Sequence, residues 1–323
     1  MEFYNDARDV KEMEYFLRRI GMPEDGTKSF LEAFNKIVEN NLVYSYNTLC
    51  KASAYCQLDD WGASEYLMMP LARVCGFSDP LMYMMLVIRS FMYLEKRYKE
   101  NGIPEEIYWD SAIDVKCKAV EHYTGNGEWG TLVAWWYPGF FSLKCMKLGR
   151  FEYEEGHARH TFKFKGVPGH DEYVLNKGSL MYNIHIPSTG ISLTDEVRMD
   201  SYRKAWEYHK HEFSDGIMPL SCGTWLLYPG HREALPETSG VRRFMNDFHI
   251  YHSFENKPGT YGEVGWRVFS IAKPTPLEEF PRDTGLRRAY HDYLLAGGKT
   301  GEGDGIFLFD GEKIYKDVIE ITD

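Results

Sequence analysis

Apolar residues follow two different periods in this chain, and the change between them constrains the fold more than any other feature of the sequence. Up to about residue 123 they recur every three or four positions, as in Val10, Met13 and Phe16, which is the period of an amphipathic helix. After residue 150 they alternate with polar residues, as in 151–154 and 160–165, which is the period of a β-strand. The sequence therefore predicts an α+β fold, in which an all-helical domain is followed by a mixed β-sheet with flanking helices.

The helical part ends at a run of turn-forming residues, Tyr123-Thr124-Gly125-Asn126-Gly127, where we place the domain boundary. The expected domains are residues 1–127 and residues 128–323. An aromatic-rich segment, 129–141, follows the boundary, and we expect it to pack between the domains, although a sugar-stacking surface is an alternative. Periodicity, Gly and Pro predict helices within the first domain near 10–20, 30–38, 42–58, 66–74, 81–99 and 104–120.

Charge and cysteine usage limit the class of protein. The net charge of −11 argues against a nucleic-acid backbone or an anionic membrane as the main partner. The longest strongly apolar run, 81–88, is too short to cross a bilayer, and the N-terminus lacks the pattern of a signal peptide. The six cysteines are scattered without a C-x-x-C pair, which is typical of a reducing compartment. We therefore expect a cytoplasmic protein, and the sequence leaves its oligomeric state open.

The segment 181–196 has the pattern of a strand, a short loop and a helix. Apolar and polar residues alternate up to Pro187, which cannot donate to a sheet and should end the strand. Ser188-Thr189-Gly190 is a loop sequence, and Ser192 with Asp195 is predicted to cap the following helix. Such an arrangement can cradle a phosphate on backbone N–H groups, but many such turns bind nothing, and the acidic pair at 195 and 196 would repel an anion.

Further strands and helices are predicted after this segment, with strands at 218–227, 241–254, 265–271 and 305–309 and helices near 229–235 and 286–295. The resulting order resembles the GNAT acyltransferase fold. More specifically, the chain resembles the two-domain family with a helical N-acyltransferase N-terminal domain and a GNAT-like C-terminal domain. The segments that carry this resemblance are KLGRFEY (147–153), YNIHIPSTG (182–190), CGTWLL (222–227) and FPRDTGLRRA (280–289).

The resemblance implies an acyltransferase that moves an acyl group from acyl-CoA to an unidentified amine or hydroxyl acceptor, with acyl-CoA as cosubstrate. It implies that the backbone N–H groups of four loop residues, Ser188, Thr189, Gly190 and Ile191, hold the pyrophosphate. The strand edge at Ile184 and Ile186 would pair with the pantetheine amides, and Arg282 would pair with a phosphate. The implied partners are thus a small-molecule acyl donor and its acceptor.

Three residues are candidates for the chemistry. His185, at the end of the strand before the loop, can accept the proton of an attacking ammonium, or it can be a packed histidine without a catalytic role. Cys222 can carry an acyl group or be a buried, inert thiol, and Tyr228 can protonate the leaving thiolate or serve only in packing. We assign no metal site, because His209 and His211 lack the spacing and carboxylate partners of one. A non-catalytic module that binds an acyl-nucleotide, a carbohydrate or a protein remains the alternative function.

Overall fold

The computed structural model describes residues 6–58 and 60–323. The chain divides into two compact units, Met1–Lys147 with Pro187–Thr189, and Leu148–Ile186 with Gly190–Asp323. We call them the helical unit and the sheet unit and describe each by itself. The units divide between Lys147 and Leu148, whereas the predicted boundary after residue 127 coincides with Gly127, the left-handed C-cap of helix α6.

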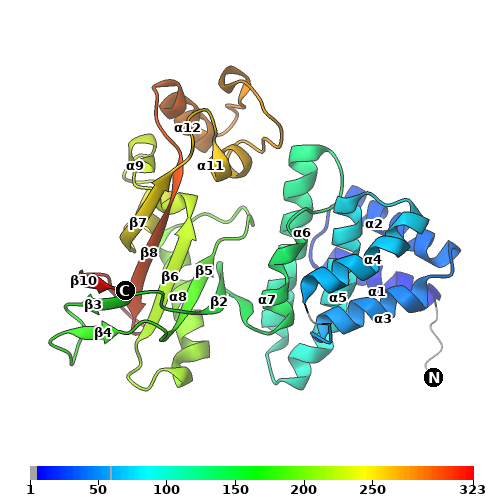
Figure 1. Ribbon diagram of the computed structural model, residues 1–323, viewed down its shortest axis with the longest axis horizontal. Helices are drawn as coiled ribbons and strands as arrows, with labels where there is room; N and C mark the ends of the chain where they lie inside the picture. Colours follow the sequence, from blue (N-terminus) through cyan, green and yellow to red (C-terminus); the bar gives the residue numbers. More distant parts are fainter. Residues whose placement is uncertain (1–5, 59) are drawn as a thin grey trace. The chain divides into compact units, whose positions relative to one another are not determined.

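The helical unit is built around α5, which contacts each of the other long helices (Figure 1). Its Met84, Leu86 and Ile88 are fully buried, as expected for a helix surrounded by others. Ser78 caps the start of α5, and a left-handed Gly76 ends the preceding helix. The helices are α1 (Asp6–Arg19), α2 (Glu24–Glu39), α3 (Val43–Ala54), α4 (Trp61–Cys75), α5 (Asp79–Glu100), α6 (Glu105–Asn126) and α7 (Pro138–Phe141).

The aromatic-rich segment 129–141 contributes to the core of the helical unit. Tyr137, Phe140 and Phe141 are buried, and their ring centroids lie 5.5–5.9 Å from that of Phe91 on α5. Edge and tilted contacts of this kind add to the free energy gained by burying the rings. These three side chains are therefore unavailable to stack on a sugar.

The main sheet of the sheet unit has the order β1-β2-β5-β6-β8-β7, with β9 pairing β8 (Figure 1). Strands β5 and β6 pair in parallel, whereas β2–β5, β6–β8, β7–β8 and β8–β9 are antiparallel pairs. The strands of this sheet are β1 (Cys145–Leu148), β2 (Phe151–His157), β5 (Leu180–His185), β6 (Met218–Thr224), β7 (His249–Glu255), β8 (Gly301–Phe309) and β9 (Ile314–Tyr315).

Different elements cover the two faces of the sheet. Helix α8 (Asp195–His209) packs Tyr202 against Phe151 and Phe307 on one face, with ring centroids 5.6 and 5.1 Å apart. A three-stranded sheet of β10 (Val318–Thr322), β3 (Thr161–Phe164) and β4 (Tyr173–Leu175) shares a core with Met181 and Ile306 on the other face. Because side chains alternate along β5, Asn183 and His185 point to the same face as Met181.

The two long strands predicted in the C-terminal part differ in outcome. The strand predicted at 241–254 is confirmed over 249–254, which belong to β7, whereas its first part forms the short helix α10 (Gly240–Met245). The strand predicted at 265–271 is wrong, because this segment overlaps the helix α11 (Gly262–Arg267). In both helical stretches the apolar residues are too few for their periodicity to distinguish a strand from a helix. The predicted helices near 229–235 and 286–295 correspond to α9 (His231–Ala234) and α12 (Gly285–Leu295).

Within residues 6–58 and 60–323, no single helix is long and apolar enough to cross a membrane. The pair α4 and α5, which bends by 117°, meets the length and composition requirement only when taken together. In the same residues, no group of three or more His, Cys, Asp or Glu side chains is arranged to hold a metal ion.

Candidate functional site

The turn between β1 and β2 is fixed against α8 and directs Arg150 toward the loop that follows β5. Gly149 has φ +75°, and a Cβ there would lie 3.0 Å from the Cα of Ser201, so a larger residue would be both strained and crowded. The Ser201 hydroxyl donates to the Leu148 carbonyl (2.6 Å) and accepts from the Phe151 N–H (3.0 Å). Arg150 is buried, and its Nε donates to the Ile191 carbonyl at 3.1 Å. This contact explains why Gly and Arg stand together in the segment 147–153.

Residues 186–194 form the loop between β5 and α8, as the sequence predicts. Gly190 has φ +77°, a left-handed conformation that favours glycine, and no atom would lie within 4 Å of a Cβ there. The Ser188 hydroxyl donates to the Glu121 carboxylate of α6, within the helical unit. Ser188 can therefore offer its hydroxyl hydrogen to a phosphate only by leaving Glu121, whereas its backbone N–H does not depend on that contact.

The predicted capping box of Ser192 and Asp195 is wrong. The N-cap of α8 is Thr194, whose hydroxyl accepts from the Val197 N–H at 3.3 Å. Ser, Thr and Asp all suit the N-cap position, and three of them occur within four residues here, so local chemistry alone could not choose between them.

Two arginines neutralise Asp195 in the first turn of α8. Arg198 Nη2 lies 2.9 Å from one carboxylate oxygen of Asp195, and Arg243 Nη1 lies 3.1 Å from the other. Arg198 also donates to the Leu193 carbonyl at 2.7 Å and to Asp247 at 2.7 Å, so it ties the end of the loop to α8 and α10. The sequence does not point to Arg243, because it lies 48 positions from Asp195 in a segment predicted as a strand, whereas Arg198 is only three positions from Asp195 and could have been found from helical spacing. The expected repulsion of an anion by Asp195 is correspondingly weakened.

Strands β5 and β6 pair over a short length and then separate. Their paired residues are Tyr182 with Leu220 and Asn183 with Ser221, and no pair beyond these forms among the described residues. Past that point, the Cys222 thiol donates to the Ile184 carbonyl at 3.2 Å. Ile184 and Ile186, predicted to present a strand edge, thus flank the position where two parallel strands diverge. Such a gap leaves backbone groups that an extended ligand can pair with.

The environment of Cys222 is that of an inert thiol. The side chain is 2% exposed, and burial, reinforced by the negative charge of Asp304, raises the pKa of the thiol well above its usual range. The thiolate is the nucleophilic form of cysteine, so this site disfavours the reactive species. The structure thus supports the buried, structural interpretation of Cys222 and not the role of acyl carrier.

His185 lies at the end of β5 and pairs with Glu154 of the neighbouring strand β2. Its Nε2 is 3.1 Å from Glu154 Oε2, and both side chains are 32% exposed, which leaves the imidazole accessible to a reactant. A carboxylate in this position orients the ring and stabilises the imidazolium that forms when the ring accepts a proton. No local sequence pattern points to Glu154, because the register between β2 and β5 is set by long-range pairing.

Tyr228 and Arg282 contact residues outside the loop 186–194. Tyr228 packs its ring against His231, with centroids 5.0 Å apart, and burial together with the nearby Glu255 raises its pKa to about 12. Arg282 donates to His291 Nδ1 at 2.8 Å and pairs with Asp292 at 2.9 Å, on α12. Within the described part of the chain, neither side chain forms a hydrogen bond with the loop 186–194. The structure therefore does not bring Tyr228 or Arg282 into contact with this loop through hydrogen bonds.

Comparison with protein-family models gives two matches, which together cover most of the chain. Residues 145–307 match the GNAT-like C-terminal domain, and residues 11–143 match the N-acyltransferase N-terminal domain. A search of curated proteins finds no match.

Among solved structures, the chain is similar to an acyltransferase in complex with decanoyl-CoA and teicoplanin, with 19% identity and a TM-score of 0.69 over 93% of this chain and 86% of that one. It is also similar to a mutant acyltransferase in complex with octanoyl-CoA, with 19% identity and a TM-score of 0.70 over 92% and 87% of the two chains. At this level of identity the likeness establishes a shared fold.

Proposed function

The chain belongs to the family with a GNAT-like C-terminal domain, preceded here by an N-acyltransferase N-terminal domain, and on that premise we propose that it transfers an acyl group from acyl-CoA to an amine or hydroxyl acceptor. One observation carries the proposal within the sheet unit. The parallel strands β5 and β6 diverge, and β5 leads through a glycine-containing loop into the N-terminus of α8. That arrangement offers both a strand edge for an extended amide chain and converging N–H groups for an anion. The structural relatives crystallised with decanoyl-CoA and octanoyl-CoA are consistent with this donor.

The donor would bind along β5 and the loop that follows it. The pantetheine amides would pair with the backbone at Ile184 and Ile186, and the pyrophosphate would lie on the N–H groups of residues 188–191. Two of these groups would exchange existing bonds, because the Thr189 N–H donates to the Pro187 carbonyl at 2.8 Å and the Ile184 carbonyl accepts from Cys222. The first N–H groups of α8 have no partner within the helix and add a favourable partial charge. The pairing of Asp195 with Arg198 and Arg243 weakens the repulsion that Asp195 would exert on an anion at this helix end. A phosphate contact of Arg282 stays a prediction, and Arg282 would have to leave His291 or Asp292 to form it.

The reaction would be a direct transfer without an acyl-enzyme intermediate. The acceptor nitrogen or oxygen attacks the thioester carbonyl carbon, its proton passes to His185, and the C–S bond breaks to release the CoA thiolate. Glu154 stabilises the imidazolium formed at His185. For the proton that returns to the thiolate we retain Tyr228 as the proposed donor; its hydroxyl is protonated at neutral pH, and the raised pKa makes it a weaker acid than an ordinary tyrosine.

Release of free CoA thiol from acyl-CoA, measured with acetyl-, octanoyl- and decanoyl-CoA against a panel of amines and alcohols, tests the proposed activity. Acceptor-dependent release supports a transferase. Thermal stabilisation by acyl-CoA without any release, across the whole panel, would instead support the alternative of a non-catalytic acyl-nucleotide-binding module.

Replacing Cys222 by Ala is expected to leave the transfer rate within about threefold of wild type, because a direct transfer needs no thiol nucleophile. A loss of activity by orders of magnitude in a protein that still melts near the wild-type temperature would restore the acyl-carrier role. Mass spectrometry of the wild-type protein after incubation with acyl-CoA alone provides a second test, and we expect no acylated cysteine.

Replacing Gly190 by Val is expected to abolish binding of CoA while the protein stays folded. A β-branched residue disfavours the φ of +77° by about 1–2 kcal/mol, but a Cβ there meets no atom within 4 Å. The loop would change conformation and lose the alignment of its N–H groups. Thermal melting measures the effect, since CoA at 100 times its dissociation constant stabilises wild type by about 2.7 kcal/mol.

Gly259 offers a matched control, because it has the same φ of +77° and equally open surroundings in a turn after β7. The Gly259→Val variant should show a similar loss of stability and keep its response to CoA. An undiminished response to CoA in Gly190→Val would mean that the pyrophosphate binds elsewhere.

A further inference from the structure

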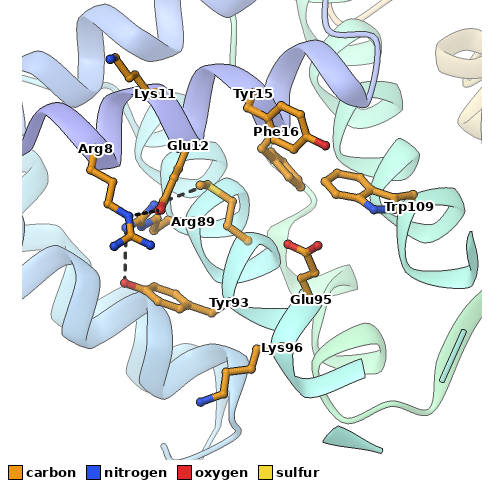
Figure 2. Close-up of a pocket in the computed structure, with 11 residues that line it drawn as sticks. Arg8, Lys11, Glu12, Tyr15, Phe16, Arg89, Tyr93, Glu95, Lys96 and Trp109 are labelled. Carbon is orange, nitrogen blue, oxygen red and sulfur yellow. Dashed lines mark hydrogen bonds and ion pairs between the residues drawn. The ribbon is translucent and has the colours of Figure 1, made fainter. Parts of the chain in front are cut away.

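A cavity of about 840 Å³ opens in the helical unit, away from the elements discussed so far (Figure 2). It is lined by side chains from α1, α5 and α6, among them Arg89, Lys11 and Trp109. Cavities of 300–1,000 Å³ are typical of sites for small molecules. From the chemistry of its lining, we infer that this cavity binds a small organic carboxylate with an apolar body. The inference does not depend on the proposed transferase activity.

Arg89 provides a fixed positive charge in the cavity lining. The residue is 3% exposed, its Nε donates to Asn47 at 2.8 Å, and its Nη2 donates to Asp9 at 2.5 Å. The contact made by Nη1 is with the Met92 sulfur, at 3.7 Å. A thioether is a weak acceptor, so Nη1 keeps donor capacity that a carboxylate oxygen can use. The Tyr93 hydroxyl lies 3.5 Å from Nη2 of Arg89, where it can take part in the same contact.

Lys11 is the second cation of the cavity lining that an anion can contact. Four basic side chains line the cavity, those of Arg8, Lys11, Arg89 and Lys96, together with the carboxylates of Glu12 and Glu95. Arg8 is paired with Glu12, Arg89 with Asp9 and Lys96 with Glu100, whereas Lys11 forms no ion pair within the described residues. The lining therefore carries no surplus of positive charge, and the contact with an anion rests on Nη1 of Arg89 and on Lys11.

Aromatic rings form the opposite wall of the cavity and call for an apolar body in the ligand. Tyr15 and Phe16 of α1 lie 6.2 and 6.0 Å from Trp109 of α6 by ring centroid, and Tyr15 is 56% exposed. Covering such rings removes apolar surface from water and stabilises the complex. An inorganic anion would leave the exposed ring of Tyr15 in water, and a neutral apolar molecule would offer no acceptor to the Arg89 donor. A carboxylate with an apolar body is the ligand class that can contact both the Arg89 donor and the aromatic rings.

Isothermal titration calorimetry of the full chain with octanoate, phenylacetate and the neutral 1-octanol tests the inference. We expect at least one carboxylate to bind about tenfold tighter than 1-octanol or more, because the charge contact is worth at least that factor. Tighter binding of octanoate would indicate a site shaped for a chain, and tighter binding of phenylacetate a site shaped for a ring. Each titration is repeated with saturating CoA, which should leave the affinity unchanged if the site is separate from the donor site.

The variants Lys11→Ala and Trp109→Leu should each weaken carboxylate binding about tenfold, since one removes a charge and the other part of the aromatic wall. Arg89→Gln should weaken it further, but it also leaves Asp9 without its charged partner and can unfold the protein, so the first two variants decide the question. Lys28→Ala on α2 is the matched control, because Lys28 is a surface lysine outside the cavity. No preference for the carboxylates over 1-octanol, displacement by CoA, or equal affinities in Lys11→Ala and Lys28→Ala would overturn the inference.

Discussion

A His185→Gln variant is expected to retain the melting temperature of the wild-type protein and to lose transfer activity by about 10²–10⁴-fold, the usual contribution of a general base. Glutamine keeps a hydrogen-bonding group beside Glu154 but cannot accept a proton near neutral pH. The attacking amine must be neutral to act as a nucleophile. Without a base in the site, only the small fraction of the amine that is already neutral in solution can react. Initial rates at saturating acyl-CoA over a range of acceptor concentrations measure the effect.

The pH dependence of the rate separates a base from a structural histidine. Without the base, the residual rate of His185→Gln should rise with pH as more acceptor becomes neutral, and part of the lost activity should return in alkaline buffer. Glu154→Gln should give a smaller loss, because the imidazole remains and loses only its orienting partner. An unchanged rate in His185→Gln, or a large drop in its melting temperature, would show that His185 is structural.

His160 provides the control for this series. It also pairs with a carboxylate, that of Asp323, at 2.9 Å, but it precedes β3 in the three-stranded sheet. His160→Gln should therefore alter neither the rate nor its pH dependence. An equal loss in both variants would point to a general effect of removing a His–carboxylate pair and not to catalysis at β5.

The sequence predicts the parts of this fold that depend on local chemistry. Pro187 marks the end of β5 to within two residues, Gly190 marks the turn of the loop, and the six long helices of the helical unit occur where periodicity indicates them. These features follow from backbone dihedral preferences and from amphipathic spacing, which act within a few residues.

The site residues that the sequence does not reveal depend on contacts between distant segments. Glu154 reaches His185 through the register of β2 with β5, and Arg198 reaches Asp247 across 49 positions. No local pattern encodes either contact. The first part of the strand predicted at 241–254 fails for a related reason, since Phe244 and Met245 fit a buried helix face as well as a strand, and the packing of α10 on α8 decides between them.

Replacing Arg198 by Ala is expected to cause a large loss of stability and, in the protein that stays folded, a loss of affinity for CoA. Arg198 is 4% exposed and holds the Asp195 and Asp247 carboxylates and the Leu193 carbonyl together. Burial raises the pKa of Asp247, and its hydrogen bond with Arg198 opposes that shift. Removing the arginine leaves a buried carboxylate without its cation, which typically destabilises a protein by about 3–5 kcal/mol, equivalent here to a melting temperature lower by about 6–20 °C.

Arg203→Ala on the same helix is the control for Arg198→Ala, because Arg203 is exposed and its loss should change stability by no more than about 0.5 kcal/mol. Affinity for CoA, measured well below the melting temperature, then separates the two roles of Arg198. The Leu193 carbonyl and Asp195 lie at the junction of the loop with α8, so releasing them should leave the N–H groups of the loop without a fixed direction. A folded Arg198→Ala protein that binds CoA as wild type does would mean that Arg198 stabilises the sheet unit without shaping the donor site.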